Sequence, residues 1–431
     1  MWNFETDPEF QRDLDWADDF VTQEIVPIDL AVGHLEDLSD PKILEALRPL
    51  QAEVRKRGLW ACHLGPELGG PGYGQLKLAL LNEILGRSDS APRIFGCSAP
   101  DTGNAEILAA YGSESQKQRY LKPLMDDEIR SCFSMTEPHA GADPTRFTTR
   151  AVRDGNEWVI NGEKWFSSNA KNSAFLIVMA VTDPNVSPYE GMSMFIVPIE
   201  TPGVNILRNV ASLGEPEGDG SAAYIRYENV RVSDDHLLGE PGGAFAISQT
   251  RLGGGRIHHA MRTVAQVRYA FDLMCERVLS RETKGEVLAN KQMVQEQIAD
   301  SWMEIEQFRL LVLRTAWRID KYKDYKKVRK DIAAVKVMMV KVLHDVAYRS
   351  MHIHGSLGVT YEMPLAKLWL EVPGLAIADG PDEVHKVTIA RQVLRDYEPS
   401  PGLWPTQHLP ARREAARKKL AHLLDLEIGN L

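Results

Sequence analysis

The segment Asn161-Gly162-Glu163-Lys164-Trp165-Phe166-Ser167-Ser168-Asn169 lies in the first half of a chain of 431 residues and holds the signals that decide its fold. Just upstream, Asp154-Gly155 is a turn signal. The apolar residues 158–160 stand between it and Asn161-Gly162, a second turn signal, which predicts tightly connected strands. Residues 175–181, 192–199 and 223–232 are β-rich and end at Pro, Gly or Asp. We therefore predict a central β domain over residues 130–242.

Helical periodicity dominates on both sides of this region. Asp7 before Pro8 has the pattern of a helix cap followed by a first-turn proline. After residue 243, two long apolar stripes follow the helical period, and we interpret them as core or subunit contacts. The stripes are Met293, Ile298, Ile305, Phe308, Val312, Ala316 and then Val328, Ile332, Val335, Met339, Leu343, Val346. The predicted class is α+β: a helical domain over 1–129, the β domain over 130–242, a four-helix-type bundle over 243–398 and an extension over 399–431.

Composition and missing motifs exclude several classes of protein. The net charge of −10 argues against nucleic-acid binding, which needs a basic face. The four cysteines form no CxxC pair, which suits a reducing compartment. We see no secretion signal and no apolar run long enough to cross a bilayer, so we expect a cytoplasmic protein without membrane insertion.

No nucleotide or metal pattern is found either. The sequence has no GxGxxG after a predicted strand, no GxxxxGK[ST] and no HExxH. Adjacent histidines, as at His258-His259, point in different directions on a helix, and we predict no metal site. We interpret the glycine run at 253–255 as part of a helix start.

Four separated segments within residues 58–396 together resemble the acyl-CoA dehydrogenase family in order and spacing. Residues 135–143, Met-Thr-Glu-Pro-His-Ala-Gly-Ala-Asp, are similar to the family's TEPxAGSD loop, and residues 161–169 are similar to NGxKxWITN. Arg281 and Gln292 match the arginine and glutamine of RxxFGxxLxxxQ. Residues 354–358 and 378–383 are similar to GGxG and YEGT. Residues 97–104 and 378–385 look closest to the subgroup related to eukaryotic dehydrogenases fused to a kinase-like domain.

The resemblance implies that the first two segments bind FAD. Small residues let backbone amides approach the edge of the flavin, where the reduced ring needs hydrogen-bond donors. Aromatic side chains would pack against the ring, and a serine hydroxyl would bond near its hydride-accepting nitrogen. The residues that we assign to the flavin on this ground are Met135, Thr136, Ala142, Trp165, Phe166 and Ser167.

The other cofactor contacts implied by the resemblance come from a neighbouring subunit. Arg281, with Gln292, would reach the flavin diphosphate of that neighbour, because a guanidinium fork suits phosphate. His352, Gly355 and Ser356 stand where the family places QxxGG against the adenosine part. Histidine replaces the glutamine and serine replaces the second glycine, which weakens this match. A shared flavin site implies a homodimer or a homotetramer.

Asp379, followed by Gly380, matches the position at which most family members carry the catalytic glutamate. The family's alternative position for the base corresponds to about Gly255, which cannot act as a base. We therefore assign the catalytic carboxylate to Asp379. The competing interpretation is an aspartate that only caps a helix. Gly380, Arg256 and Ala142 are assigned to the substrate.

The resemblance implies an FAD-dependent acyl-CoA dehydrogenase of fatty acid β-oxidation, with an electron-transfer flavoprotein as acceptor. Two alternatives stay open. Nitroalkane oxidases resemble this pattern, use an aspartate as base and release peroxide. A flavin-retaining, DNA-associated relative would need a basic C-terminal domain, and the basic clusters near 326–330 and 412–419 are short.

Overall fold

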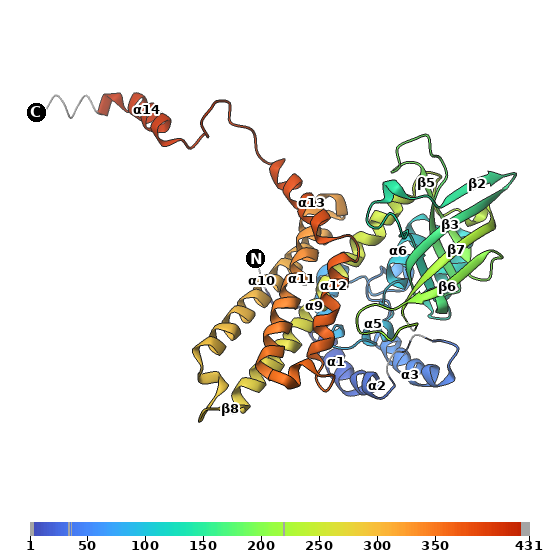
Figure 1. The fold of residues 1–431 in the computed structure, drawn as a ribbon, viewed down its shortest axis with the longest axis horizontal. Coiled ribbons are helices and arrows are strands. Elements are labelled where there is room, and N and C mark those ends of the chain that lie inside the picture. Colours follow the sequence, from blue (N-terminus) through green and yellow to red (C-terminus); the bar gives the residue numbers. More distant parts are fainter. Residues whose placement is uncertain (1–3, 33–34, 36, 219, 424–431) are drawn as a thin grey trace, which may run out of the picture. The chain divides into compact units, whose positions relative to one another are not determined.

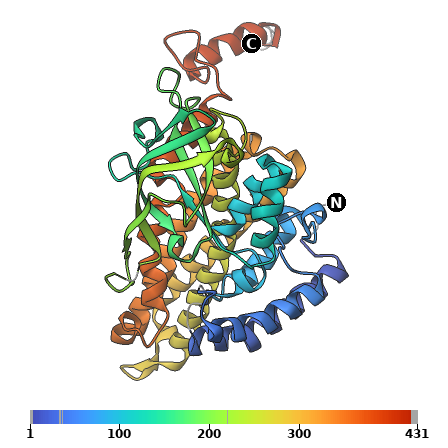
Figure 2. The same cartoon turned by 90° about the vertical axis from the view of Figure 1, so that its right-hand side faces the viewer.

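The structure is a computed structural model that describes residues 4–32, 35, 37–218 and 220–423 (Figures 1 and 2). Helices come first, strands follow and helices return, as the sequence predicts. Asp7 caps the first helix by accepting a hydrogen bond from Phe10 N at 2.9 Å, and Pro8 occupies its first turn. The longer helices of this first part are α1 (Pro8–Phe20), α3 (Pro41–Arg57), α4 (Gly74–Leu85) and α6 (Asp101–Tyr111).

The middle of the chain forms a seven-stranded sheet. Its order is β1-β4-β2-β3-β7-β6, with β5 paired to β4. The strands are β1 (Ser131–Ser134), β2 (Arg150–Asp154), β3 (Glu157–Ser168), β4 (Phe175–Val181), β5 (Met192–Pro198), β6 (Val204–Val210) and β7 (Ala222–Ser233). The three predicted β-rich segments coincide with β4, β5 and β7 to within a residue. Strand β6 was not predicted, because its exposed Ile206-Leu207-Arg208 stretch shows no alternation.

The prediction of a turn at Asn161-Gly162 is wrong. β3 runs through this pair and only shifts its register against β7 between Ile160 and Gly162. Gly162 has φ 148°, and a Cβ on it would lie 2.5 Å from Thr149 Oγ1, so glycine is required by a close approach inside the sheet. The turn at 155–156, by contrast, does join β2 to β3.

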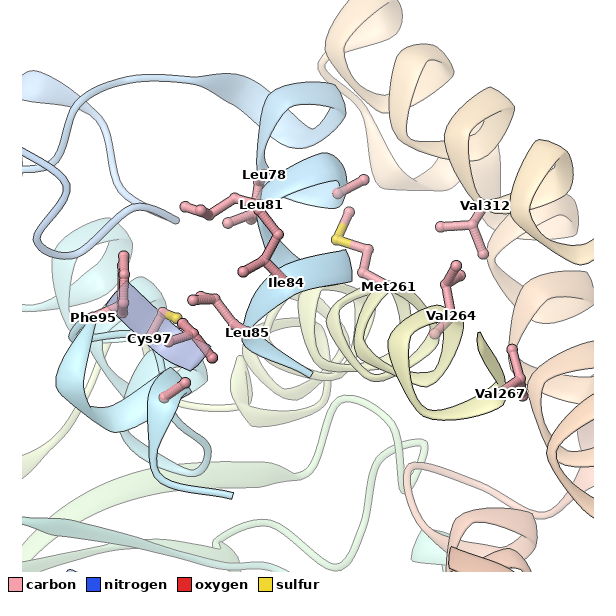
Figure 3. Packing of buried hydrophobic residues seen from close by; sticks show 14 of the residues in the cluster. Leu78, Leu81, Ile84, Leu85, Phe95, Cys97, Met261, Val264, Val267 and Val312 are labelled. Carbon is pink, nitrogen blue, oxygen red and sulfur yellow. The ribbon is translucent and has the colours of Figure 1, made fainter. Parts of the chain in front are cut away.

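The second helical part is built on α9 (Ala244–Ser280), which packs against α4, α6, α10 (Gln292–Tyr322) and α11 (Tyr325–His354). Figure 3 shows Leu81 and Leu85 of α4 near Met261 and Val264 of α9 in the shared core. Two shorter helices, α12 (Leu365–Ile377) and α13 (Asp382–Leu394), follow. The glycine run at 253–255 lies inside α9 and not at its start, since α9 begins at Ala244, nine residues before Gly253.

The two apolar stripes lie on α10 and α11. Every residue of the second stripe is buried, and so are Ile305, Phe308, Val312 and Ala316 of the first. Met293 is an exception: it stands in the first turn of α10 and is 75% exposed. Its assignment to the core of this chain is therefore corrected.

Residues 1–386 form one compact unit and residues 387–431 form another. The second unit contains the short helix α14 (Leu409–Lys419), all of whose residues are exposed. The boundaries at 130, 243 and 399 remain proposals, since secondary structure changes near them but the first unit packs as one body. None of the described helices is long and apolar enough to span a membrane.

Candidate active site

The first two motifs meet through one ion pair inside the β domain. Lys164 Nζ lies 2.9 Å from Glu137 Oε1 and donates to Met135 O at 2.7 Å, and both charged side chains are fully buried. The backbone N–H groups of Thr148 and Thr149 also donate to the Glu137 carboxylate. Burial lowers the pKa of Lys164 to about 8, and Glu137 opposes this shift. The pair fastens the 135–143 loop to β3.

Next to this pair, β3 is irregular at two aromatic residues. Its register against β7 shifts between Lys164 and Ser167, and Phe166 has φ 51°. A bulge of this kind re-aims side chains. As a result, Phe166 is 48% exposed and the Trp165 ring meets it edge-on, with centroids 4.8 Å apart. Trp165 N donates to Thr136 O at 3.0 Å, so the first motif is also paired to this strand.

The two serines that follow face opposite sides of the strand. Ser167 is fully buried, and its hydroxyl lies 3.0 Å from the hydroxyl of Ser134 inside the domain. Ser168 is exposed. The Ser167 hydroxyl is therefore turned into the domain and away from any ligand on the outer face of the sheet, whereas Ser168 presents the exposed hydroxyl. The error was one residue of register, which reverses the face of a strand.

The 135–143 loop presents small residues to solvent. Met135 and Thr136 are half-buried, whereas Gly141 and Ala142 are exposed. Gly141 has φ 55°, a conformation that suits glycine, and its N–H donates to Glu137 O at 3.2 Å. The loop thus offers main chain without bulky side chains, as the resemblance implied.

Asp379 lies in the short loop between α12 and α13 and is held by its main chain. The residue has φ 55° and Gly380 has φ 102°. The Asp379 carbonyl accepts a hydrogen bond from Arg256 Nε of α9 at 2.9 Å and lies 3.2 Å from His385 Nε2. Burial, reinforced by Arg256, lowers the pKa of His385 to about 4. The ring is therefore neutral, and its Nε2–H tautomer donates to the carbonyl.

A buried lysine braces both ends of the same loop. Lys336 of α11 donates to Ala376 O at 2.8 Å and to Asp382 Oδ1 at 2.7 Å, and its side chain is fully buried. Ala376 lies in the last turn of α12, and Asp382 begins α13. The loop that carries Asp379 is therefore fixed from three helices.

The Asp379 carboxylate itself points at the glycine run. A Cβ on Gly255 would lie 3.0 Å from Asp379 Oδ2. Within the described part of the chain, no hydrogen bond to this carboxylate is formed, and it does not cap α13. Burial lowers the pKa of Arg251, of Arg256 and of Lys336, and the negative charge of Asp379 opposes this shift in each case. The helix-cap interpretation is not supported, and the carboxylate is free to meet a ligand.

Arg251 connects the two halves of the site. Its guanidinium lies over the ring of Phe133 on β1, 4.0 Å from the centroid, and the nearby charge of Asp379 acts on it. Phe133 precedes the 135–143 loop by two residues. Sequence reasoning missed Arg251 and Lys336, which belong to no recognisable motif. It also missed the role of His385, which stands in the 378–385 stretch but shows its contact with Asp379 only in the structure.

The remaining predicted residues form a separate group. Arg281 Nη1 donates to His354 O at 3.2 Å, and a Cβ on Gly355 would lie 3.2 Å from the same nitrogen. Just after Arg281, Lys284-Gly285 forms the turn of a hairpin between β8 (Glu282–Thr283) and β9 (Glu286–Val287). Gln292, His352 and Ser356 are all exposed. The arginine and the 354–356 segment, far apart in sequence, thus share one exposed patch.

Comparisons with known proteins fit this geometry. Three family models match: the N-terminal domain of acyl-CoA dehydrogenases over residues 8–128, the middle domain over 132–230 and the C-terminal domain over 242–394. The chain belongs to the acyl-CoA dehydrogenase family. It therefore has that family's fold and is an enzyme that acts on the CH–CH bond of an acyl-CoA. The predicted family and fold class are confirmed.

Individual relatives of this acyl-CoA dehydrogenase agree. A Mycobacterium tuberculosis protein named probable acyl-CoA dehydrogenase FadE2 is 43% identical over 362 residues, which are 83% of this chain and 87% of that protein. Acyl-CoA dehydrogenase family member 11 of Gallus gallus is 39% identical over 88% of this chain, which spans only 49% of that relative. A solved structure from Mycobacterium abscessus, assigned to the acyl-CoA dehydrogenases, has a TM-score of 0.85 and 37% identity, covering 92% of this chain and all of the other.

Proposed function

We propose that this chain is an FAD-dependent acyl-CoA dehydrogenase that converts an acyl-CoA into the 2-enoyl-CoA and passes the electrons to an electron-transfer flavoprotein. The observation that carries the proposal is the Asp379 carboxylate. It forms no hydrogen bond with the residues that the structure describes, lies against Gly255 and stands on a loop that three helices hold in place. A base that must reach the α carbon needs this combination of fixed backbone and free side chain.

The exposed residues of the 135–143 loop and of the end of β3 together suit a flavin. Phe166 offers an aromatic surface, Ser168 offers a hydroxyl, and Gly141-Ala142 offer main-chain groups without bulk. Flavin, when bound, accepts the hydride from the β carbon. Met135, Thr136 and Trp165 remain in the proposed contact set, and Ser168 replaces Ser167 in it.

The residues of the helical part would remove the proton and position the substrate. Asp379 would take the α proton onto a carboxylate oxygen, and its backbone N–H would donate to the thioester oxygen. Arg256 and His385 keep the peptide in position by binding its carbonyl. Gly380 and Gly255 leave space for the side chains of His385 and Asp379, which a Cβ at either glycine would approach to about 3 Å.

The exposed patch of Arg281, Gln292, His352, Gly355 and Ser356 would meet the FAD of a neighbouring subunit. Its support is the juxtaposition of Arg281 with His354 and Gly355, two segments that the family pattern assigns to the same ligand. A homodimer or homotetramer follows from this contact. Cytoplasmic location and a role in β-oxidation belong to the same proposal.

Anaerobic flavin bleaching tests the function. The purified, FAD-loaded protein should lose its yellow colour when a panel of acyl-CoAs is added. Asp379→Asn should keep bound flavin yet bleach at least ~1000-fold more slowly, since the amide cannot take a proton. Bleaching by Asp379→Asn at the normal rate would show that the base is misassigned. Peroxide release with nitroethane and no bleaching by any acyl-CoA would favour a nitroalkane oxidase, and tight duplex DNA binding would favour the DNA-associated alternative.

A further inference from the structure

The helix α14 (Leu409–Lys419), labelled in Figure 1, lies beyond the three family models, the last of which ends at residue 394. All of its residues are exposed. A helix of 11 residues is marginal in water unless its side chains pack against something. The family's fold therefore does not explain this helix, and its side chains are the place to look for what it meets.

α14 is strongly basic in an acidic chain. It carries five basic residues and one acidic residue, whereas the whole chain has a net charge of −10. Three of the basic residues stand in its last turn, where they balance the helix dipole. Arg412 and Arg413 lie near its start, where positive charge opposes the dipole. The dipole therefore does not account for this charge, but attraction to an anionic surface does.

Three of the five basic side chains also lack a partner. Lys418 pairs with Glu414, one turn earlier, at 2.8 Å. Within the described part of the chain, three others form no hydrogen bond or ion pair; they are Arg413, Arg417 and Lys419. Their charges are therefore available to a ligand.

An apolar stripe runs between these charges. Leu409, Ala416 and Leu420 follow the helical period at i, i+7 and i+11, so they share one face. Both leucines are exposed. By the same spacing, Arg413 and Arg417 flank the stripe on one side, and two further basic residues flank it on the other. Basic side chains so placed can lay their stems along an apolar layer and keep their charges at its surface.

The segment before α14 adds an exposed tryptophan. Trp404 is 58% exposed, and its ring stacks on that of His408 with the centroids 4.6 Å apart. Ser400 Oγ donates to Trp404 O at 2.6 Å, which fixes the turn that presents the ring. Tryptophan favours the boundary between water and the apolar layer of a bilayer. The segment therefore offers the same kind of partner to a surface as the leucine stripe does.

Two other anionic partners account for fewer of these observations. A second copy of this chain could offer the acidic residues Glu9, Asp15 and Asp19, which are exposed on α1. Within α1, all of which the structure describes, no large apolar side chain is exposed to meet the leucines. A nucleic-acid backbone would likewise satisfy the charges and leave the leucines in water. An anionic bilayer surface takes up both.

We propose that α14, together with Trp404, binds the surface of a bilayer rich in anionic phospholipid. The helix lies in the plane of the surface, with its leucine stripe and the indole ring toward the acyl chains and its unpaired basic groups among the headgroups. The attachment is peripheral and brings the enzyme to the surface without any change at Asp379. This inference goes beyond the proposed function and does not depend on it.

Co-sedimentation of the 431-residue chain with vesicles tests the charges. Vesicles of phosphatidylglycerol and phosphatidylcholine in equal parts should bind it, pure phosphatidylcholine should not, and added salt should weaken the binding. Arg413→Gln/Arg417→Gln should bind roughly 25-fold more weakly, since each basic residue near such a surface contributes about fivefold. Glutamine keeps the helix propensity of arginine. Lys326→Gln/Lys327→Gln, at two exposed lysines of α11, is the matched control and should bind as the wild type does.

The leucine stripe is tested by a second pair of variants. Leu420→Gln should weaken vesicle binding roughly tenfold, because a leucine side chain that leaves water contributes at least about that much. Leu207→Gln, at a leucine of β6 with nearly the same exposure, is the control and should have no effect.

Wild-type protein that stays in solution with the anionic vesicles would overturn the proposal. Equal weakening by the lysine control, or full binding by Leu420→Gln, would overturn it as well. Tight binding of duplex DNA without vesicle binding would assign α14 to nucleic acid instead. A smaller particle for Arg413→Gln/Arg417→Gln in lipid-free gel filtration, again without vesicle binding, would assign it to a second copy of the chain.

Discussion

On the β domain, Glu137 and Lys164 are held by a buried ion pair between their side chains, whereas on the helical side Asp379 is held through its main-chain carbonyl. In the first case the charged groups are consumed by the scaffold and face no ligand. In the second, Arg256 and His385 fix the backbone, and across residues 4–32, 35, 37–218 and 220–423 nothing bonds the carboxylate. The contrast shows two ways of using charged residues in one site. Charges that only stabilise the backbone can be buried in an ion pair, but a side chain that must react has to be left without such a partner.

Lys164→Met should have the largest effect, because it breaks the support on the β side. It leaves Glu137 buried without its partner, and losing one member of a buried pair costs about 3–5 kcal/mol. Chemical denaturation should show this loss in the free energy of unfolding, and FAD content should fall with it. The double variant Lys164→Met/Glu137→Met should regain part of the stability. A single variant as stable as the wild type would contradict the role of the pair.

Acidification should destabilise the helical side. Burial lowers the pKa of His63 to about 3 and those of His259 and His385 to about 4, and His258 shifts in the same direction. An unfolded histidine has a pKa near 6.5, so below that pH the unfolded chain binds more protons and the free energy of unfolding falls until about pH 4. Glu106, with its raised pKa, acts in the opposite direction and offsets one histidine.

Each uncompensated ring should lose up to about 2.7 kcal/mol between pH 7 and pH 4.5, since pH 4.5 lies two units below the unfolded pKa and one unit corresponds to about 1.4 kcal/mol. Denaturation at a series of pH values measures it. His385→Gln should flatten the dependence, while His139→Gln, on an exposed loop residue, should leave it as it is. Stability that rises on acidification would show that these rings are not buried as neutral groups.

Gly255→Ala should have the smallest effect. It distinguishes stability from reactivity most clearly, because it should raise the first and lower the second. Alanine stabilises a helix by about 0.5–1 kcal/mol over glycine. Its Cβ would approach Asp379 Oδ2 to 3.0 Å and push the carboxylate aside, so bleaching should slow roughly tenfold, or about 1.4 kcal/mol. Gly374→Ala in α12 is the control: it meets nothing within 4 Å and should gain stability without losing rate. Equal rates in both variants would remove Gly255 from the site.

Much of the fold could be predicted from the sequence because its signals are local. The cap at Asp7, the apolar period of α11 and the β-rich segments of β4 and β5 each depend on neighbouring residues. Local patterns also led to the two motifs on the β domain and to Asp379. Local patterns could not show which face of the sheet each residue of β3 occupies after the bulge at Phe166. A shift of one residue decides whether Ser167 or Ser168 faces outward, and no sequence pattern predicts this bulge.

Contacts between residues that are far apart in the sequence could not be predicted for another reason. Arg251 and Glu106 are 145 positions apart, and a lone arginine or glutamate on a helix is usually a solvated one. The glycine run at 253–255 carried the only hint, since three adjacent glycines inside a helix are costly unless something needs the space. Only the packing of α6 on α9 shows what occupies it.

The left-handed backbone of Asp379 narrows what evolution or a designer can place there. Aspartate, asparagine and glycine enter this region of φ and ψ readily, while longer or branched side chains do so at a cost. Replacing the aspartate by the longer glutamate of related enzymes therefore changes two things together, the reach of the acid and the ease of the turn. If position 379 were randomised and active variants were selected, aspartate should be recovered more often than glutamate, unless Gly380 and Pro381 are varied as well.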